Sequence, residues 1–171
     1  MAERRPLPGT IGLTQIKGLV GWLVRLLQFI NGDFKKATHV FVVLDDETVF
    51  EAQPGGAVVT PLSEYDDRWV EYVDWPLTPE KRFAIVARAR QYVGIGYNWT
   101  TYFYLAAYRL HIRPQWLKDR VQNDKRMICS QAADKIYADE DEHLFNDHRM
   151  PYDLTPGDIA RLPTWKPNEV A

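Results

Sequence analysis

Residues 38–53 have the sequence T-H-V-F-V-V-L, then D-D-E, then T-V-F-E-A-Q, and this stretch decides the fold. Its two outer runs are rich in β-branched and aromatic residues, which favour strands, and the acidic triplet between them is typical of a turn. The stretch therefore predicts an antiparallel β-hairpin with strands at Thr38–Leu44 and Thr48–Gln53.

Two polar side chains, His39 and Glu51, lie inside these apolar strands. Side chains alternate between the faces of a strand, so the loop length determines whether the two meet. A loop with an odd number of residues, such as Asp45 to Glu47, makes them cross-strand neighbours, directly opposite or diagonal, whereas an even loop separates them. Carboxylates are depleted from half-buried strands, so Glu51 indicates a partner for the imidazole. The alternative for His39 is an ordinary histidine near a sheet end.

Outside the hairpin, the sequence predicts further strands first and helices later. Short strands are expected at Thr10–Thr14, Ala57–Thr60 and Arg68–Trp75. Thr78 before Pro79 is typical of a helix start, and this helix is expected to end near Gly94. Further helices are expected at Leu19–Ile30, Tyr97–Leu110, Cys129–Tyr137 and from Thr155-Pro156-Gly157-Asp158, followed by a loose tail from Pro163. The predicted fold class is α+β, with a small antiparallel sheet packed against helices.

The single cysteine of the chain, Cys129, opens one of the predicted helices. A thiol at that position faces the positive end of the helix dipole and unpaired N–H groups, which stabilise a thiolate. Lys125 and Arg126 add positive charge just upstream. With His39 as a base, Cys129 predicts Cys–His acyl transfer. The alternative is an inert buried thiol, because free cysteine is among the most buried residue types.

Further segments carry a resemblance to known cysteine peptidases. Residues 94–99, G-I-G-Y-N-W, and Cys129-Ser130 resemble the G-x-P-Y-x-W and C-S segments of NlpC-type enzymes, with Gly96 in place of the proline. In this chain the histidine precedes the cysteine. That order is similar to the circularly permuted papain-like branch, the YiiX/YaeF-like and lecithin retinol acyltransferase-like proteins, in which an S-H-x-x-[IV] strand is followed by an [IV]-[IV]-E-A strand. The resemblance runs from about Gly9 to Leu162.

This resemblance implies a permuted papain-like fold and a cysteine amidase or peptidase. Carried over residue by residue, it implies that Cys129 is the nucleophile, His39 the general base and Glu51 the polar residue that orients the base. Tyr97 corresponds to a tyrosine near the catalytic cysteine, as an oxyanion or substrate contact; the alternative is an ordinary core tyrosine. The implied substrates are cell-wall peptides or lipid-linked amides and esters, and no cofactor is implied.

Composition limits the classes of partner. The chain has 21 basic and 23 acidic residues and a formal net charge of −2. A phosphate-binding face usually appears as a basic excess, so nucleic acid is not expected as a partner. A length of 171 residues fits a single domain, 1–171, with a core large enough to fold without a disulfide.

Two other features have plain interpretations. His143 and His148 lie among acidic residues, but their spacing matches no metal-site pattern, so we expect an acidic surface loop and no metal. Leu19–Ile30 has apolar side chains at helical spacing, which favours a helix covering a core over one on a membrane surface. That run is too short to span a bilayer, and residues 1–9 do not begin an export signal, so cytoplasmic synthesis is the default expectation.

Three functions remain open from the sequence. The first is a cysteine hydrolase acting through a Cys-His-Glu triad and a thioacyl enzyme. The second is a non-catalytic structural or binding module of the same fold, for example a phage or cell-surface assembly component, in which Cys129 is unreactive. The third is a lipid acyltransferase at a membrane surface, which rests on the Leu19–Ile30 helix.

Overall fold

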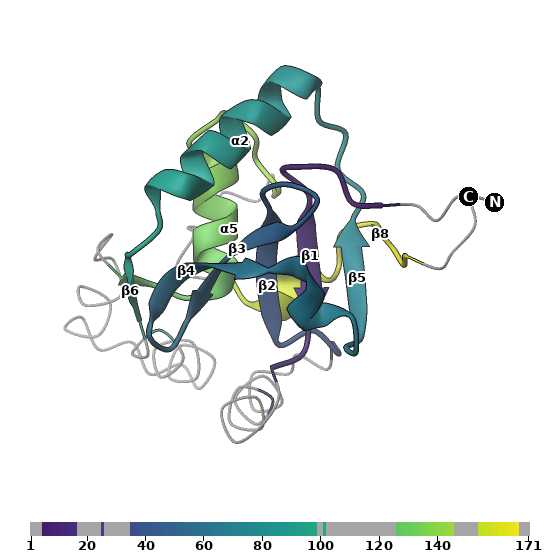
Figure 1. The fold of residues 1–171 in the computed structure, drawn as a ribbon, viewed down its shortest axis with the longest axis vertical. Helices are drawn as coiled ribbons and strands as arrows, with labels where there is room; N and C mark the ends of the chain where they lie inside the picture. Colours follow the sequence, from purple (N-terminus) through teal and green to yellow (C-terminus); the bar gives the residue numbers. More distant parts are fainter. Residues whose placement is uncertain are drawn as a thin grey trace.

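The computed structural model describes residues 5–16, 35–98, 126–145 and 154–167, together with Arg25 and Thr101. Within these ranges, six strands form an antiparallel sheet in the order β4-β3-β2-β1-β5-β8 (Figure 1). The strands are β1 (Ile11–Thr14), β2 (His39–Val43), β3 (Thr48–Gln53), β4 (Gly56–Pro61), β5 (Val70–Val73) and β8 (Thr164–Trp165). The predicted α+β class and the predicted antiparallel sheet are both confirmed.

The β2–β3 hairpin closes through the odd-numbered loop Asp45 to Glu47. The N–H of Leu44 donates to the carbonyl of Thr48 (2.9 Å), and Phe41 pairs with Glu51 in the register of the two strands. His39 lies two residues before Phe41, so it shares a face with Glu51 as a diagonal neighbour. This is one of the two arrangements that the sequence predicted.

Two helices cover one face of the sheet (Figure 1): α2 (Pro79–Gln91) and α5 (Cys129–Ala138). Thr78 caps α2 as predicted, since its hydroxyl accepts from the N–H of Lys81 at 3.3 Å. The side chains buried between these helices and the sheet form one apolar cluster, which includes Val40, Val42, Phe50, Ile85, Ile128 and Ile136. This packing fixes α5 over β2 and β3.

The far end of α5 is tied to the beginning of the chain. The hydroxyl of Tyr137 donates to the carbonyl of Gly9 at 2.5 Å, and both groups are buried. The guanidinium of Arg82, on α2, donates to the carbonyl of Pro8 at 3.1 Å. The segment before β1 is therefore held by both helices.

The other face of the sheet carries stacked aromatic rings. Phe41 stacks on Tyr65 with ring centroids 4.6 Å apart, and Tyr72 packs against Trp165 at 4.9 Å. Tyr65 belongs to a short 3-10 helix, η1 (Leu62–Tyr65), that follows β4. Gly12, the partner of Phe41 in β1, leaves room for the Phe41 ring, because a Cβ at Gly12 would lie 2.1 Å from the Phe41 Cζ.

The structure corrects two expectations about local structure. The tail from Pro163 is not loose at Thr164 and Trp165, because the Trp165 ring packs on Tyr72 and the two residues pair with β5. Tyr97 does not begin a helix, because Gly96–Tyr97 forms β6 and pairs in parallel with β7 (Arg126–Met127). The other predicted elements with described residues, including α6 (Pro156–Ile159), form close to the expected positions.

Several predictions fall on residues that are not described. These are the helix predicted at Leu19–Ile30 apart from Arg25, the helix predicted at Tyr97–Leu110 apart from Tyr97, Asn98 and Thr101, and the positions of Lys125 and His148. Among the described residues, no helix combines the length and the apolar character that crossing a bilayer requires.

We predict that Gly12→Ala destabilises the protein through its clash with Phe41. The new Cβ would lie 2.1 Å from Phe41 Cζ, and overpacking of this kind typically lowers the free energy of unfolding by about 1–3 kcal/mol. Urea denaturation measures the change. Gly55→Ala is the matched control, because a Cβ there has no heavy atom within 4 Å. Equal losses in the two variants would contradict the assigned packing.

Candidate active site

Cys129 is the first residue of α5, and Ile128 is the residue before the helix. The side-chain oxygen of Gln131 accepts from the N–H of Ile128 at 3.0 Å, and the hydroxyl of Ser130 donates to the carbonyl of Leu154 at 2.8 Å. These bonds hold the first turn of the helix in place. The Cys129 residue is 2 % exposed, so its thiol is nearly enclosed.

His39 and Glu51 form a buried hydrogen bond. The Nε2 atom of His39 lies 2.5 Å from the Oε2 atom of Glu51, and neither residue is more than 3 % exposed. The amide of Gln53 donates to the other carboxylate oxygen at 2.7 Å. The carboxylate therefore holds the imidazole ring through Nε2 and leaves Nδ1 available.

The thiol of Cys129 also affects the pKa of the same imidazole. Burial disfavours the charged ring, but the negative charge and hydrogen bond of Cys129, together with those of Glu51, raise the pKa of His39 from 6.5 to about 10. The Nδ1 atom makes no hydrogen bond of regular geometry within the described part of the chain. Because Nε2 is bonded to Glu51, Nδ1 is the ring nitrogen left to face the sulfur. The structure thus brings Cys129, His39 and Glu51 together.

Glu51 stays ionised in this buried position because it accepts several hydrogen bonds. Burial alone would raise the pKa of Glu51, but the hydrogen bond and charge of His39, with hydrogen bonds from Thr60 and Tyr65, lower it to about 2. A carboxylate that remains charged can stabilise an imidazolium without taking its proton. The group is therefore suited to orienting His39.

Sequence reasoning missed Tyr65 as a member of the site. Burial and then the charge of Glu51 raise the pKa of the Tyr65 hydroxyl above its usual range, so this hydroxyl remains a donor. The guanidinium of Arg68 lies over the Tyr65 ring, 5.0 Å from its centroid. A tyrosine just beyond a strand is a weak signal, because its contact with Glu51 depends on how η1 folds back.

Tyr97 lies beside the segment that leads into Cys129. In the parallel β6–β7 pair it is the partner of Met127, two residues before Cys129, and it is 7 % exposed. The structure therefore brings the backbone of Tyr97 close to the start of α5. Its role in binding remains a prediction.

The acidic run after α5 is engaged in ion pairs. Arg88, on α2, pairs with Glu140 at 2.8 Å, which joins α2 to the end of α5. Lys135 pairs with Asp139 at 3.1 Å within the end of α5 itself. Among the described residues, which include His143, no group of three or more His, Cys, Asp or Glu side chains is arranged to hold a metal ion.

With this geometry established, the chain can be compared with known proteins. No protein-family model matches the chain, and no curated protein matches its sequence. Its structure resembles the crystal structure of the metalloprotein yiiX from Escherichia coli O157:H7, with a TM-score of 0.56 and 19% sequence identity. The two chains share a fold. The match covers 79% of this chain and 66% of that one, so this chain spans just under two thirds of its neighbour's length.

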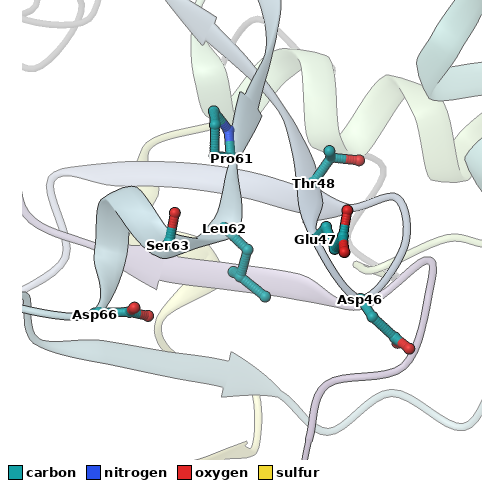
Figure 2. A pocket seen from close by; sticks show the side chains of 7 residues that line it. All are labelled: Asp46, Glu47, Thr48, Pro61, Leu62, Ser63 and Asp66. Carbon is teal, nitrogen blue, oxygen red and sulfur yellow. The ribbon is translucent and has the colours of Figure 1, made fainter.

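A hollow of about 490 Å³ lies away from the Cys129 site, at the β2–β3 turn and η1. Figure 2 shows the residues that line it, which are Asp46, Glu47, Thr48, Pro61, Leu62, Ser63 and Asp66. Its lining includes none of the three residues Cys129, His39 and Glu51. The hollow is thus separate from the candidate chemistry.

We predict that Tyr65→Phe raises the pKa of Glu51 while preserving the ring stack on Phe41. A hydrogen bond to a charged group is worth about 1.5–3 kcal/mol, or roughly 1–2 pH units. Folding lowers the pKa of Glu51, so the ionised carboxylate stabilises the folded protein at pH values above its ordinary pKa of 4.5. This stabilisation is lost as the pH falls towards 2. Acid unfolding of Tyr65→Phe should therefore begin at higher pH, as followed by circular dichroism.

The control for this prediction is Tyr72→Phe. Burial, and then the charge of Asp66, raises the pKa of Tyr72 to about 12, and Glu51 is not among the causes. The midpoint of acid unfolding in Tyr72→Phe should therefore lie closer to that of wild type than the midpoint in Tyr65→Phe does. The same midpoint in Tyr65→Phe and wild type would contradict the assigned hydrogen bond.

Proposed function

We propose that this chain is a cysteine hydrolase of the circularly permuted papain-like type, which cleaves an amide or ester bond through a thioacyl enzyme. The observation that carries the proposal is the buried hydrogen bond of His39 Nε2 to Glu51, together with the electrostatic interaction of Cys129 with the same ring. A nucleophile, a base and an orienting carboxylate in this order form the arrangement that activates a thiol. The shared fold with yiiX supports the proposal at the level of the fold.

The first half of the reaction forms the thioacyl enzyme. In the resting enzyme the proton of the Cys129 thiol already lies on Nδ1 of His39, and the thiolate sulfur of Cys129 attacks the carbonyl carbon of the substrate. As the S–C bond forms, the carbonyl electron pair moves onto oxygen, which the N–H of Cys129 stabilises. The oxyanion then re-forms the carbonyl, the bond to the leaving group breaks, and the His39 imidazolium gives its proton to the departing amine or alkoxide.

The second half returns the enzyme to its starting state. Neutral His39 takes a proton from a water molecule, whose oxygen attacks the thioester carbon. The second tetrahedral intermediate collapses, the C–S bond breaks, and the sulfur leaves as a thiolate beside the His39 imidazolium while the acid product is released. Throughout both halves, Glu51 keeps its charge and holds Nε2 of His39.

The substrate class follows from the resemblance of the sequence motifs. We propose a cell-wall peptide or a lipid-linked amide or ester, with Tyr97 as a contact in the binding site. The near-complete enclosure of Cys129, which is 2 % exposed, favours the rival view of a non-catalytic module. The reactivity of the thiol separates the two.

We predict that p-nitrophenyl acetate acylates Cys129 with release of one equivalent of p-nitrophenolate. Because the chain has one cysteine, Cys129→Ser tests the nucleophile directly and should lose the burst of absorbance and the acetyl group seen by mass spectrometry. Circular dichroism confirms that the variant folds. Equal labelling of wild type and Cys129→Ser, or labelling of neither, would support the non-catalytic module.

We predict that iodoacetamide alkylates the folded protein almost as fast at pH 6 as at pH 8. The pKa of His39 is raised to about 10, so its imidazolium persists across this range and stabilises the thiolate. An unassisted thiol with a pKa of about 8.5 should lose close to a hundredfold in rate over the same interval. Mass spectrometry measures the rate.

Two controls fix the interpretation of that pH profile. The chain unfolded in urea carries the same cysteine and should follow an unassisted thiol. His39→Asn should lose the reactivity at pH 6, and unchanged alkylation in this variant would remove His39 from the site.

A further inference from the structure

Arg68, which follows η1, has no carboxylate partner in the part of the chain that the structure describes. This is unexpected, because three acidic residues lie close to it in the sequence: Glu64, Asp66 and Asp67. Its buried Nε atom also has no hydrogen-bond partner there. Instead, the guanidinium lies over the Tyr65 ring, 5.0 Å from the ring centroid. The cation is therefore directed at an aromatic ring and not at an acid.

The backbone around Arg68 is fixed to the sheet. The N–H of Arg68 donates to the carbonyl of Tyr65 at 3.0 Å, which closes the turn between η1 and β5. The carbonyl of the next residue, Trp69, accepts from the hydroxyl of Thr14, on β1, at 2.8 Å. These two bonds give the side chain of Arg68 a fixed starting point beside the ring.

Tyr65 connects this cation to the candidate active site. Its ring stacks on Phe41 with centroids 4.6 Å apart, and the residue is 3 % exposed. Its hydroxyl donates to the carboxylate of Glu51, which in turn holds Nε2 of His39. A positive charge near a phenol stabilises negative charge on its oxygen and so makes the hydroxyl a stronger donor. The charge of Arg68 can therefore reach the imidazole through two intervening side chains.

We infer that Arg68 is a positioning residue, whose charge over the Tyr65 ring strengthens the hydrogen bond from Tyr65 to Glu51. The inference rests on the proposed function. In this role Arg68 transfers no proton and forms no bond with the substrate. A stronger bond to Glu51 keeps the carboxylate ionised and the His39 ring in one orientation, and both effects favour the imidazolium that accompanies the thiolate.

A double-mutant cycle separates the charge of Arg68 from its packing. Arg68→Met removes the charge and keeps an extended side chain, while Tyr65→Phe removes the hydroxyl and keeps the ring. Wild type, the two single variants and the double variant are acylated with p-nitrophenyl acetate at several concentrations, which gives a limiting rate and a half-saturating concentration. A packing contribution of Arg68 would persist in Tyr65→Phe, whereas a contribution through the hydroxyl would disappear.

Arg68→Met should lower the limiting rate of the wild-type protein by about two- to fivefold, the range of an exposed cation–π interaction, without changing the half-saturating concentration. The same substitution should leave the rate of Tyr65→Phe unchanged. Arg68→Lys should restore most of the rate, because it keeps the charge. If circular dichroism shows that Arg68→Met does not fold, Arg68→Gln replaces it in the cycle. Arg161→Met is the matched control and should keep the wild-type rate, because Arg161 is an exposed cation that pairs with Asp158 at 3.6 Å.

The outcomes keep this inference apart from the function on which it rests. A wild-type protein that is not acylated at Cys129 overturns the hydrolase proposal and, with it, the role of Arg68. In an acylated protein, an equal loss in both backgrounds, or no loss in either, overturns the role of Arg68 alone. A higher half-saturating concentration at an unchanged limiting rate does the same, because it makes Arg68 a contact of the substrate.

Discussion

The site depends on one buried hydrogen bond, the 2.5 Å contact between His39 and Glu51. Removing two ionisable groups from water costs several kcal/mol each, and a buried pair is tolerated only when further hydrogen bonds satisfy its atoms. Gln53, Thr60 and Tyr65 supply these bonds to the carboxylate, and Cys129 supplies a counter-charge to the ring. The arrangement holds an imidazole in one orientation next to a thiol, as the proposed hydrolase requires.

The sheet and the helix contribute different constraints to this contact. The odd loop of the β2–β3 hairpin sets the register that puts His39 and Glu51 on one face. The apolar cluster under α5 sets the position of the sulfur, because Ile128 and Ile136 are fully buried on either side of the first two turns. The aromatic stack of Phe41 on Tyr65 then fixes the hydroxyl that reaches Glu51. Each part of the site is thus held by packing outside it.

Local sequence signals predicted the parts of the fold that depend on neighbours in the chain. The hairpin, the shared face that an odd loop gives to His39 and Glu51, and the helix cap at Thr78 follow from alternation, loop parity and capping chemistry, and the structure has all three. Contacts between distant segments could not be predicted in this way. The pairing of Trp165 with Tyr72, the parallel pairing of Tyr97 with Met127 and the bond from Tyr65 to Glu51 arise only when the chain is folded.

The bond from Tyr137 to Gly9 joins positions 128 residues apart, and its consequence concerns the order of events during synthesis. His39 and Glu51 leave the ribosome before Cys129, on a hairpin that forms from local contacts. The sulfur follows only after most of the chain, and its helix docks against the opening segment later still. Contacts this distant in sequence slow folding, because a long loop must close before they form. A nascent chain would therefore carry His39 and Glu51 for some time before Cys129 docks, so that the proposed reactivity would arise only in the folded molecule.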